Sequence, residues 1–298
     1  MYAGDDWKRA QPSTKKLNTS YLVWRTVLKR RGIVFGRASI KWQSHGVFTK
    51  YWRLEDDGTW TKVKQLTKPV LIEDRTRGFH PETGIHEIKT YLEKLDIVRH
   101  VPIFNYPEFT DLIDSKLNQS ALFYGHMPQT RLWLPGDELQ NPQSKRLVLK
   151  GISGFGGDFV EITTAKRIKF KHMRIEQEFV KASKNGQLKD TRIVFIGSKP
   201  IYSFQRSAPK GSFLTNIHLG GSFSFIPLST IRPLVQHAKK LAQILDVFPK
   251  RLFSLDFMID SRSGKPYLIE CNSKPTREPL RGAIARTYFE ALAKHIYS

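Results

Sequence analysis

The sequence predicts an α/β domain followed by an α+β body, and three features carry this prediction. Amphipathic helical patterns alternate with short apolar strands over the first 110 residues. A glycine-rich loop, KGISGFGG at 150–157, lies between two strand patterns. Two apolar strands, 251–260 and 266–272, are joined by the turn SRSGK and carry carboxylates among their apolar residues.

In the first domain, the spacing of apolar residues places each element. Residues 1–18 are polar and basic, which predicts a peripheral arm. Residues 21–31 (YLVWRTVLKRR) have apolar side chains at helical spacing before Gly32, and 85–95 show a second amphipathic helix. The strands expected here are 33–40, 47–54 paired with 60–63 around the turn DDG, 68–73 and 101–104.

The second half of the chain predicts an antiparallel sheet with helices. An amphipathic helix is expected over 231–245, and a last helix over 283–296. The strands expected before the carboxylate-bearing pair are 146–150, 159–163, 174–181, 191–197 and 200–206.

Composition limits the classes of protein that fit. The chain has 298 residues, 40% of them hydrophobic, which is enough for one large or two ordinary domains with real cores. A single cysteine rules out an internal disulfide framework and suits a reducing compartment. No apolar run reaches the roughly 18–20 residues of a membrane span, and the start MYAGDDWKRAQPSTKK lacks the apolar stretch of a signal peptide. We therefore expect a cytoplasmic protein without a membrane anchor.

The charge of the chain is strongly positive and unevenly spread. The formal net charge is +22, and residues 1–53 hold twelve Lys and Arg against two Asp. Such a field attracts nucleic acid, an acidic protein or peptide, or a membrane surface. A cationic surface that serves only solubility is the alternative, and charge alone does not choose between them.

The loop KGISGFGG has the composition of a hairpin that covers phosphates. Its glycines let backbone N–H groups approach an anion, and Lys150 adds a point charge. It is neither a P-loop nor a Rossmann turn, because no helical pattern opens behind it. Taken alone, a glycine-rich hairpin is more often structural.

The stretch YLIECNSKPT at 267–276 places polar ligands on a buried strand. Glu270 and Asn272 are two residues apart and so share one face of the strand. Asp256 lies amid apolar neighbours on the preceding strand, which predicts a close cross-strand pair of carboxylates. Hard oxygen ligands of this kind hold Mg²⁺ together with nucleotide phosphates. The alternative is that the carboxylates pair with Arg251 or Arg277.

The segment between these motifs, 190–221, is rich in groups that bind anions. Asp190 and Arg192 share a strand face, Arg206 ends the following strand, and Asn216 lies in a polar loop flanked by glycine. The planar guanidinium matches both phosphate and carboxylate. Each arginine alone is more often part of a surface ion pair.

Taken in order, these segments resemble the ATP-grasp superfamily, and most closely its RimK-like ribosomal-protein glutamate ligases and LysX-like carrier-protein ligases. The resemblance covers 101–298 in detail and the first hundred residues in outline. Eight segments carry it: DSKLNQSALFYGHMPQT (114–130), LVLKGISGFGGDFVEI (147–162), IEQEFVK (175–181), DTR (190–192), Arg206, NIHLGG (216–221), LDF (255–257) and IECNSKP (269–275).

The resemblance implies a role for each of these positions. Lys116 and Lys150 would hold the nucleotide phosphates beneath a lid formed by Gly154, Gly156 and Gly157. The implied adenine hinge and its neighbour on the nucleotide side comprise Glu176, Gln177, Glu178, Phe179, Val180 and Asp190. The implied catalytic and metal residues are Arg192, Arg206 and Asn216 at the reacting groups, and Asp256, Glu270 and Asn272 around Mg²⁺ or Mn²⁺.

One departure from the family pattern leaves the substrate open. The "Phe-Arg-Ser-Asn" element of the family reads Phe213-Leu214-Thr215-Asn216 here, so leucine replaces the arginine on the substrate side. The identity of the amino acid substrate, glutamate included, is therefore not fixed by the resemblance. Cys271 alternates with the proposed ligands and is interpreted as a core residue.

The resemblance also implies an architecture and a reaction. The expected parts are the basic arm and pre-grasp substrate domain at 1–110, a central lid subdomain at 111–185 and an antiparallel-sheet catalytic domain at 186–298. The implied enzyme is an ADP-forming ligase in which a carboxylate attacks ATP to give an acylphosphate, and an amine then displaces phosphate to form an amide. Related ligases are often dimers or tetramers, so the resemblance allows a homo-oligomer, and the sequence itself leaves the oligomeric state open.

The basic first domain suggests what the enzyme acts on. Its proposed substrate-binding cations are Arg25, Lys29, Arg30 and Arg31, with Arg37, Lys41, Trp24 and Trp42 nearby. An acidic peptide or protein with an amino acid co-substrate is the leading expectation, because ligases of this branch often act on acidic tails. Alternatives are an RNA-directed protein, since aromatics stack on bases, and a small-molecule ligase or kinase with an incidental basic surface.

Overall fold

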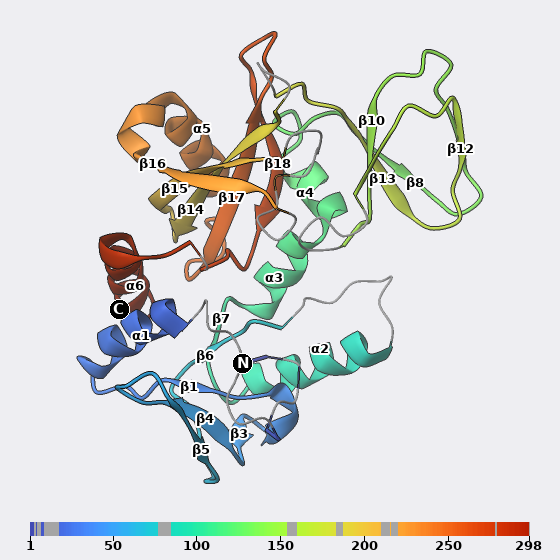
Figure 1. Cartoon of the computed structure of the whole chain (residues 1–298). Helices are drawn as coiled ribbons and strands as arrows, with labels where there is room; N and C mark the ends of the chain where they lie inside the picture. Colours follow the sequence, from blue (N-terminus) through green and yellow to red (C-terminus); the bar gives the residue numbers. More distant parts are fainter. Residues whose placement is uncertain are drawn as a thin grey trace. The chain divides into compact units, whose positions relative to one another are not determined.

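The computed structural model describes most of the chain. The described residues are 1–2, 4, 7–8, 18–76, 85–153, 160–182, 187–209, 215, 220–277 and 279–297. The chain folds into two compact units (Figure 1). The first consists of Met1–Asp111, Phe248–Leu252 and Lys274–Ser298, and the second of Leu112–Val247 and Phe253–Ser273.

The first unit combines helices with small sheets. Its helices are α1 (Asn18–Lys29), α2 (Ile85–Val98) and α6 (Gly282–Tyr297), and α3 (Pro107–Asp114) begins in it. An antiparallel sheet has the order β1 (Gly36–Arg37), β4 (Tyr51–Leu54), β5 (Trp60–Val63). A hairpin pairs β2 (Gln43–Ser44) with β3 (Val47–Phe48), and β6 (Ile72–Glu73) runs parallel to β7 (Ile103–Phe104).

Two contacts bring C-terminal segments into the first unit. The indole of Trp24 on α1 stacks on Phe289 of α6, with ring centroids 5.2 Å apart. The side chain of Asn105 donates to the carbonyl of Leu252 and accepts from its amide, both at 2.7 Å. Buried aromatic and backbone contacts of this kind explain why Lys274–Ser298 belongs to this unit rather than to the second.

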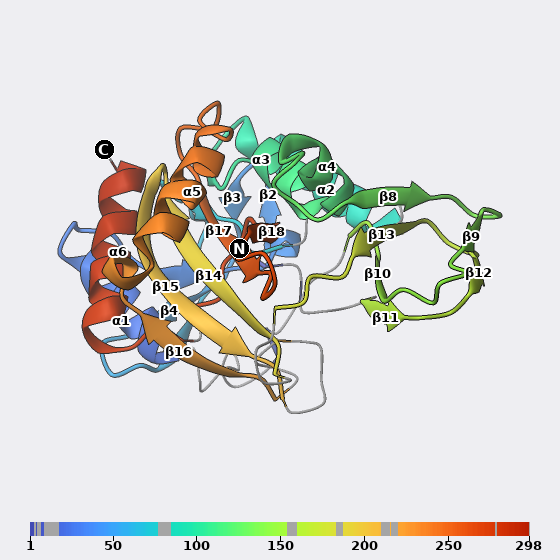
Figure 2. The ribbon, with the colours of Figure 1, turned by 90° about the horizontal axis from the view of Figure 1, so that it is seen from above.

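The described part of the second unit contains a four-stranded sheet, a two-stranded sheet and a five-stranded sheet, seen from above in Figure 2. The four-stranded sheet has the order β11 (Glu161–Thr163), β10 (Leu147–Lys150), β13 (Arg174–Glu178), β8 (Thr130–Trp133), with antiparallel pairing throughout. Beside it, β9 (Glu138–Gln140) pairs with β12 (Arg167–Lys169). The short helix α4 (Lys116–Leu122) also belongs to this unit.

The larger sheet has five strands and carries a helix. Its order is β16 (Ser222–Ile226), β15 (Lys199–Ser207), β14 (Lys189–Ile196), β17 (Leu252–Ile259), β18 (Pro266–Asn272). A 3₁₀ turn at Leu228–Ile231 leads into α5 (Arg232–Gln243), whose apolar face is buried against the sheet. The central strands β14 and β17 are buried almost throughout, so charged residues there need partners within the fold.

Most predicted elements are present, with three corrections. The strand expected over 33–40 reduces to β1, because a 3₁₀ turn capped by Ser39 begins at Ile40. The strand expected over 47–54 breaks into β3 and β4 at Thr49, whose amide turns to bond the carbonyl of Trp42. The sequence does not predict the elements β2, α3, α4, β8, β9, β12 and β16. Among the described helices, none is long and apolar enough to cross a membrane.

The predicted three-part division at 110 and 185 remains a prediction. The two compact units are defined by contacts between residues. They do not test a functional boundary between the four-stranded and the five-stranded sheet of the second unit.

Candidate nucleotide and metal site

A buried ionic cluster occupies the five-stranded sheet of the second unit. Arg192 donates from Nε to Asp256 Oδ1 at 2.6 Å and from Nη2 to Oδ2 at 2.5 Å. Arg206 bridges two carboxylates, binding Asp190 at 2.7 and 2.8 Å and Asp256 at 2.6 Å. The hydroxyl of Thr215 also donates to Asp190. All four charged side chains are less than 10% exposed, so each depends on the others for its charge.

Sheet register explains this cluster. Asp190 on β14 lies directly opposite Arg206 on β15, and Arg192, two residues on from Asp190, shares its face. Burial alone would raise the pKa of Asp256, but Arg192 and Arg206 hold it below its usual value. Burial alone would lower the pKa of Arg206, and Asp256 and Asp190 raise it. In contrast, burial raises the pKa of the Asp190 carboxyl above its usual value, and Arg206 opposes this shift.

The proposed metal ligands lie together on the next two strands. Asp256 on β17 is paired in register with Glu270 on β18, and the pairing shifts just after Asp256. Irregularities of this kind re-aim side chains next to active sites. The Asn272 amide lies 3.4 Å from Asp256 Oδ2. Glu270 is the accessible member, with a side chain 28% exposed and 3.6 Å from Lys116 Nζ.

The ion pairs exclude one alternative for Asp256. The sequence also allows the carboxylates to pair with Arg251 or Arg277, but Asp256 binds Arg192 and Arg206 instead. Arg277 belongs to the first unit, where it binds Glu73 at 2.7 Å.

Both proposed phosphate lysines face the same carboxylates. Lys150 ends β10, is 8% exposed, and donates from Nζ to Gln177 Oε1 at 2.6 Å. Burial lowers the pKa of Lys150 to about 8, with Lys116 lowering it further and Glu270 and Asp256 opposing the shift. Lys116 begins α4 behind its cap Ser115. Two cations thus lie near Glu270 and Asp256 from two different elements.

The predicted adenine hinge lies on β13 and just beyond its end. Gln177 is 4% exposed and donates to Thr130 Oγ1 at 3.1 Å, while Glu176 accepts from Trp133 Nε1 at 2.8 Å. Glu178 is exposed, Phe179 stacks on the Arg146 guanidinium at 5.0 Å, and Val180 is buried. Gln177 therefore orients Lys150, whereas the hinge role of the segment remains a prediction.

Four predicted residues lie outside the described part of the chain: Gly154, Gly156, Gly157 and Asn216. Their proposed roles as lid and substrate contact remain predictions.

One positioning residue was missed by the sequence reading. Gln119 on α4 is 1% exposed and brackets Cys271, donating to its carbonyl at 2.9 Å and accepting from its amide at 2.7 Å. Cys271 lies between Glu270 and Asn272, and its side chain is buried as expected. The amide of Gln119 thereby fixes the strand that carries two proposed ligands. The only sequence signal for Gln119 is its position three residues after Lys116, which places both residues on one side of a helix.

Of the proposed substrate cations in the first unit, Arg25 and Lys29 lie on α1, and Arg30 and Arg31 follow its end. Lys29 binds Asp56 at 2.9 Å, and Arg25 binds the same carboxylate. Arg30 lies 3.2 Å from Glu290, and Arg31 donates to the carbonyl of Val27. Their role in substrate binding remains a prediction.

The two tryptophans near these cations do not fit the alternative in which aromatic residues stack on RNA bases. Trp24 and Trp42 are 4% and 3% exposed, so they form core and are not available for stacking on bases.

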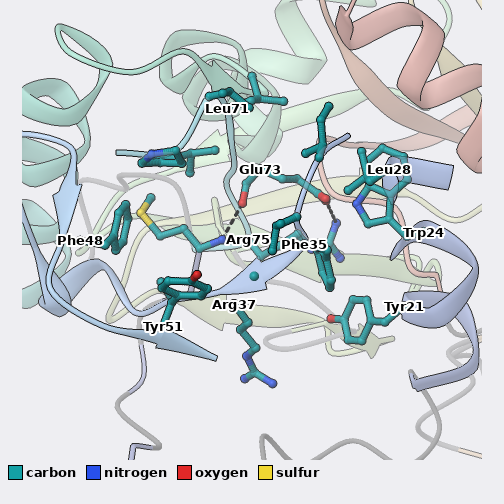
Figure 3. A pocket seen from close by; sticks show the side chains of 18 of the residues that line it. Tyr21, Trp24, Leu28, Phe35, Arg37, Phe48, Tyr51, Leu71, Glu73 and Arg75 are labelled. Atoms are coloured by element: carbon teal, nitrogen blue, oxygen red, sulfur yellow. Dashed lines mark hydrogen bonds and ion pairs between the residues drawn. The ribbon is translucent and has the colours of Figure 1, made fainter. Parts of the chain in front are cut away.

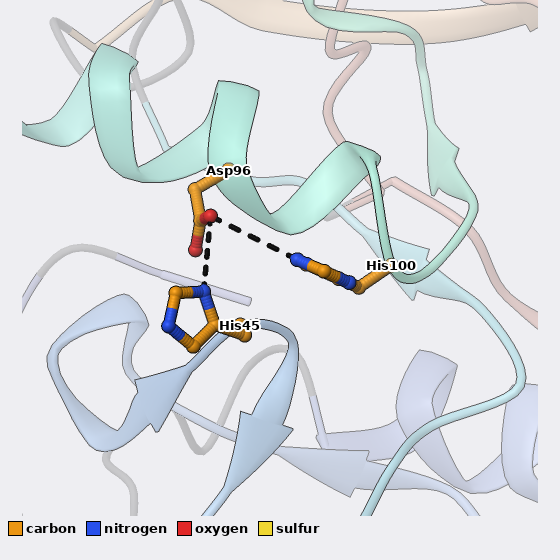
Figure 4. A group of neighbouring side chains, drawn as sticks. All are labelled: His45, Asp96 and His100. Atoms are coloured by element: carbon orange, nitrogen blue, oxygen red, sulfur yellow. Dashed lines mark hydrogen bonds and ion pairs between the residues drawn. The ribbon is translucent and has the colours of Figure 1, made fainter.

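A further group of possible metal ligands lies on the surface of the first unit (Figure 4). The Asp96 carboxylate on α2 is 3.1 Å from His45 and 3.9 Å from His100. Two imidazoles suit softer ions than Mg²⁺, which prefers oxygen ligands. This group therefore differs in chemistry from the predicted magnesium site.

Comparison with known proteins identifies one segment of the chain, which includes residues of both units. Residues 141–288 match the model of the RimK-like ATP-grasp domain. The chain carries a RimK-like ATP-grasp domain. Apart from Lys116 and Gln119, every charged or amide residue of the site described above lies inside the matched segment.

Curated relatives agree with this family. A probable alpha-L-glutamate ligase of Shewanella pealeana is 33% identical over half of this chain, and one of Marinomonas is 27% identical over 54% of it. The chain spans 32% of the length of the first relative and 53% of the second.

Solved structures confirm the predicted ATP-grasp fold. The ATP-grasp ligase PsnB complexed with its minimal precursor aligns with a TM-score of 0.53 over 92% of this chain and 94% of its own, at 14% identity. D-alanyl-alanine synthetase A from Vibrio cholerae aligns with a TM-score of 0.56 over 100% and 97%, at 13% identity. Identities this low establish the fold alone.

Proposed function

We propose that this chain is an ATP-dependent carboxylate–amine ligase that releases ADP and forms an amide bond. The observation that carries the proposal is that Lys116 and Lys150 both lie near Glu270, which pairs in register with Asp256, the partner of Arg192. Two lysines, two carboxylates and buried arginines are the parts needed to hold a triphosphate and neutralise its reacting phosphoryl group. The curated relatives carry the name of alpha-L-glutamate ligases, which supports the same reaction class.

The residues present fit a divalent cation. Asp256, Glu270 and Asn272 offer oxygen atoms from the paired strands β17 and β18. The Glu270 side chain is exposed enough to exchange Lys116 for a metal ion. Mg²⁺, or Mn²⁺ with the same ligand preference, would neutralise charge on the nucleotide phosphates when bound. One related structure, PsnB with a phosphomimetic precursor variant, was solved with Mg and ADP.

The chain itself contributes alignment and charge. Lys116 and Lys150 would bind the phosphates, and Gln177 holds Lys150 in place. Arg192 and Arg206 are fixed by Asp256, which pre-orients their guanidinium groups. The substrate carboxylate attacks the γ-phosphate of ATP, giving an acylphosphate and ADP. An amine then attacks the acyl carbon, forming the amide and releasing phosphate.

The substrate proposed is an acidic peptide or protein, joined to an amino acid. The supporting observation is the net charge of +22, with the exposed Lys29, Arg30 and Arg31 at the end of α1 and directly after it. Arg30 and Lys29 are paired with carboxylates at the surface, where such pairs are weak and exchange readily with a polyanion. An RNA substrate is the second candidate, favoured by the same charge.

The proposal is tested by ADP release from Mg²⁺–ATP with pooled amino acids, with and without acidic peptides. We expect peptide-dependent ADP release that disappears in Glu270→Gln and persists in the matched surface variant Glu138→Gln. Mass spectrometry of the peptide then identifies the addition. Failure of the folded protein to bind Mg²⁺–ATP would refute the proposal, whereas RNA-dependent release that falls steeply with salt would replace the peptide by RNA.

A further inference from the structure

Two imidazoles and one carboxylate meet on the surface of the first unit (Figure 4). They belong to His45, Asp96 and His100, which form the His–Asp–His group. A separate cavity of about 420 Å³ with an aromatic wall lies in the same unit (Figure 3), and none of the three residues lines it. All three belong to Met1–Asp111, whereas the proposed phosphate and magnesium ligands belong to the second unit. The proposed ligase site therefore gives this group no role.

His45 lies at the tip of the hairpin formed by β2 and β3. The φ angles of His45 and Gly46 are 49° and 77°, so both residues of this two-residue turn have the left-handed conformation. The sequence that such turns favour most strongly is Asn-Gly. The turn itself therefore does not require an imidazole at this position, where the side chain is 72% exposed.

Gly46 brings the tip of the hairpin against the end of α2. A Cβ at Gly46 would lie 2.8 Å from Val101 Cγ2 and 3.3 Å from His100 Cβ, so glycine permits this close approach. Phe48 of β3, Ile97 of α2 and Val101 belong to one buried hydrophobic cluster. Core packing therefore holds the hairpin and the helix end together, and the spacing of the two imidazoles does not depend on their own contacts.

Asp96 and His100 lie one helical turn apart at the end of α2, so their side chains share one face. The carboxylate oxygen Oδ1 of Asp96 lies 3.1 Å from His45 Nδ1 and 3.9 Å from His100 Nε2. The centres of the two imidazole rings are 5.5 Å apart. One ligand atom from each side chain lies within 4.8 Å of the other two. Three possible ligand atoms from two elements therefore converge on one point.

This donor set suits a transition-metal ion such as Zn²⁺. Zn²⁺ binds histidine nitrogen and carboxylate oxygen at about 2.0–2.2 Å, so neighbouring ligands of a tetrahedral ion lie roughly 3.4 Å apart. The separations in the His–Asp–His group differ from this spacing by at most about 1.5 Å. Side-chain rotation supplies a change of this size at an exposed site. Mg²⁺, in contrast, prefers oxygen ligands.

The contacts within the His–Asp–His group are easily exchanged for a metal ion. Among the described residues, its three side chains form ion pairs only with one another. Exposed pairs of this kind contribute little to stability, and both imidazoles face the same oxygen of Asp96. Replacing these pairs by bonds to a dication therefore costs little and satisfies all three groups at once.

We propose that the His–Asp–His group binds Zn²⁺ or a similar transition-metal dication through His45 Nδ1, His100 Nε2 and a carboxylate oxygen of Asp96. Three protein ligands at an exposed position leave a fourth position for water. The bound ion ties the β2–β3 hairpin to the end of α2, and it stabilises the folded first unit because it binds the folded chain. The inference is independent of the proposed ligase reaction, because all three ligands belong to the first unit.

The experiment is a calorimetric titration of the full chain with Zn²⁺, with excess Mg²⁺ present to compete at oxygen sites. We expect a saturable site whose affinity falls at least about tenfold in His45→Asn and in His100→Gln, because even the loss of a residue that only orients a metal ligand costs about 10–100-fold. Asn-Gly is the sequence that the turn favours, so His45→Asn removes the ligand and keeps the hairpin. The matched control His172→Gln, an exposed histidine of the second unit, should leave the affinity unchanged.

Thermal unfolding separates metal binding from folding. Without Zn²⁺, His45→Asn should have nearly the same Tm as the unmodified chain, because it loses only an exposed ion pair. Saturating Zn²⁺ should raise the Tm of the unmodified chain, since the ion binds the folded state. The same Zn²⁺ concentration should leave the Tm of His45→Asn almost unchanged.

Three results would overturn the inference. A titration without saturable Zn²⁺ binding would show that the group is an ion pair and nothing more. Affinity that survives both His45→Asn and His100→Gln would place the ion elsewhere. An equal loss in His172→Gln would show that Zn²⁺ binds surface imidazoles without selecting this group. Glu270→Gln should bind Zn²⁺ normally, so failure of this site and failure of the ligase proposal are separable.

Discussion

Both units bury charged residues, but they bring those residues together in different ways. In the second unit, Asp190, Arg192, Arg206 and Asp256 lie on adjacent strands of one sheet and satisfy one another. In the first unit, Glu73 and the buried Arg277 come from segments far apart in the chain and bind each other at the wall of the aromatic cavity. Strand register sets the first arrangement, whereas the second depends on the C-terminal segment belonging to the first unit.

This difference shows that a buried ion pair can either orient groups within one sheet or join segments that are distant in the chain. The cluster of the second unit orients groups for chemistry, since each guanidinium is held by a bidentate carboxylate. The pair of Glu73 and Arg277 instead ties Lys274–Ser298 to the first unit. The predictions below break one arrangement at a time.

The largest effect is expected for Asp256→Asn. This change leaves Arg192 and Arg206 buried with half of their counter-charge gone, which should lower the free energy of unfolding by about 3–5 kcal/mol. Ligase turnover should fall by a factor of roughly 10³ or more, because a proposed metal ligand is lost as well. Urea unfolding and ADP release measure the two effects. Asp246→Asn, an exposed position of the same unit, should change neither, and a fully stable Asp256→Asn would contradict the cluster.

Glu73→Gln makes the matching change in the first unit. It leaves Arg277, which is 5% exposed, without its carboxylate, and should cost about 3 kcal/mol of unfolding free energy. Mg²⁺–ATP affinity of the folded protein should stay within about twofold of the unmodified chain, as isothermal titration calorimetry can measure. A loss of nucleotide binding would show that the two charged clusters are coupled rather than independent.

The sequence predicts the second cluster far better than the first, for a physical reason. Strand alternation places Asp190 and Arg192 on one face, and a short turn places Asp256 opposite Glu270, so local rules suffice. Only the ion pairs of Asp256 with Arg192 and Arg206 needed the strand order β15–β14–β17, which no local pattern gives.

The cavity could not be predicted in this way. Arg277 meets Glu73 across about two hundred residues of chain, and Trp24 reaches Phe289 through the return of α6 to the first unit. The apolar stripe of α1 was visible in the sequence, but its aromatic residues looked available to solvent beside the basic cluster. In the folded chain Trp24 and Trp42 are buried core residues, and this burial cannot be read from the sequence.

A smaller effect is expected for Gln119→Leu. The variant leaves the amide and carbonyl of Cys271 without their buried partner, which should cost about 2 kcal/mol of unfolding free energy. Because the strand carrying Glu270 and Asn272 then loosens, the Mg²⁺ concentration needed for half-maximal ADP release should rise about tenfold. Gln140→Leu, an exposed control in the same unit, should leave the Mg²⁺ dependence alone. Lost stability with unchanged Mg²⁺ dependence would reduce Gln119 to a packing role.

The smallest expected effect is a change of nucleotide affinity with pH, to which the titration of Lys150 contributes. Its pKa in the folded protein is about 8, below the ordinary value of 10.5, because burial disfavours the ammonium. The folded state therefore loses this proton first, so stability should rise with pH between about 8 and 10.5, where the unfolded chain still binds it. Phosphate binding needs the charged form, so Mg²⁺–ATP affinity should fall by up to about tenfold from pH 7 to pH 9. In Lys150→Arg the charge persists at both pH values, and the affinity should become nearly independent of pH. An equally steep fall in the arginine variant would assign the titration to another group and remove Lys150 from the phosphate site.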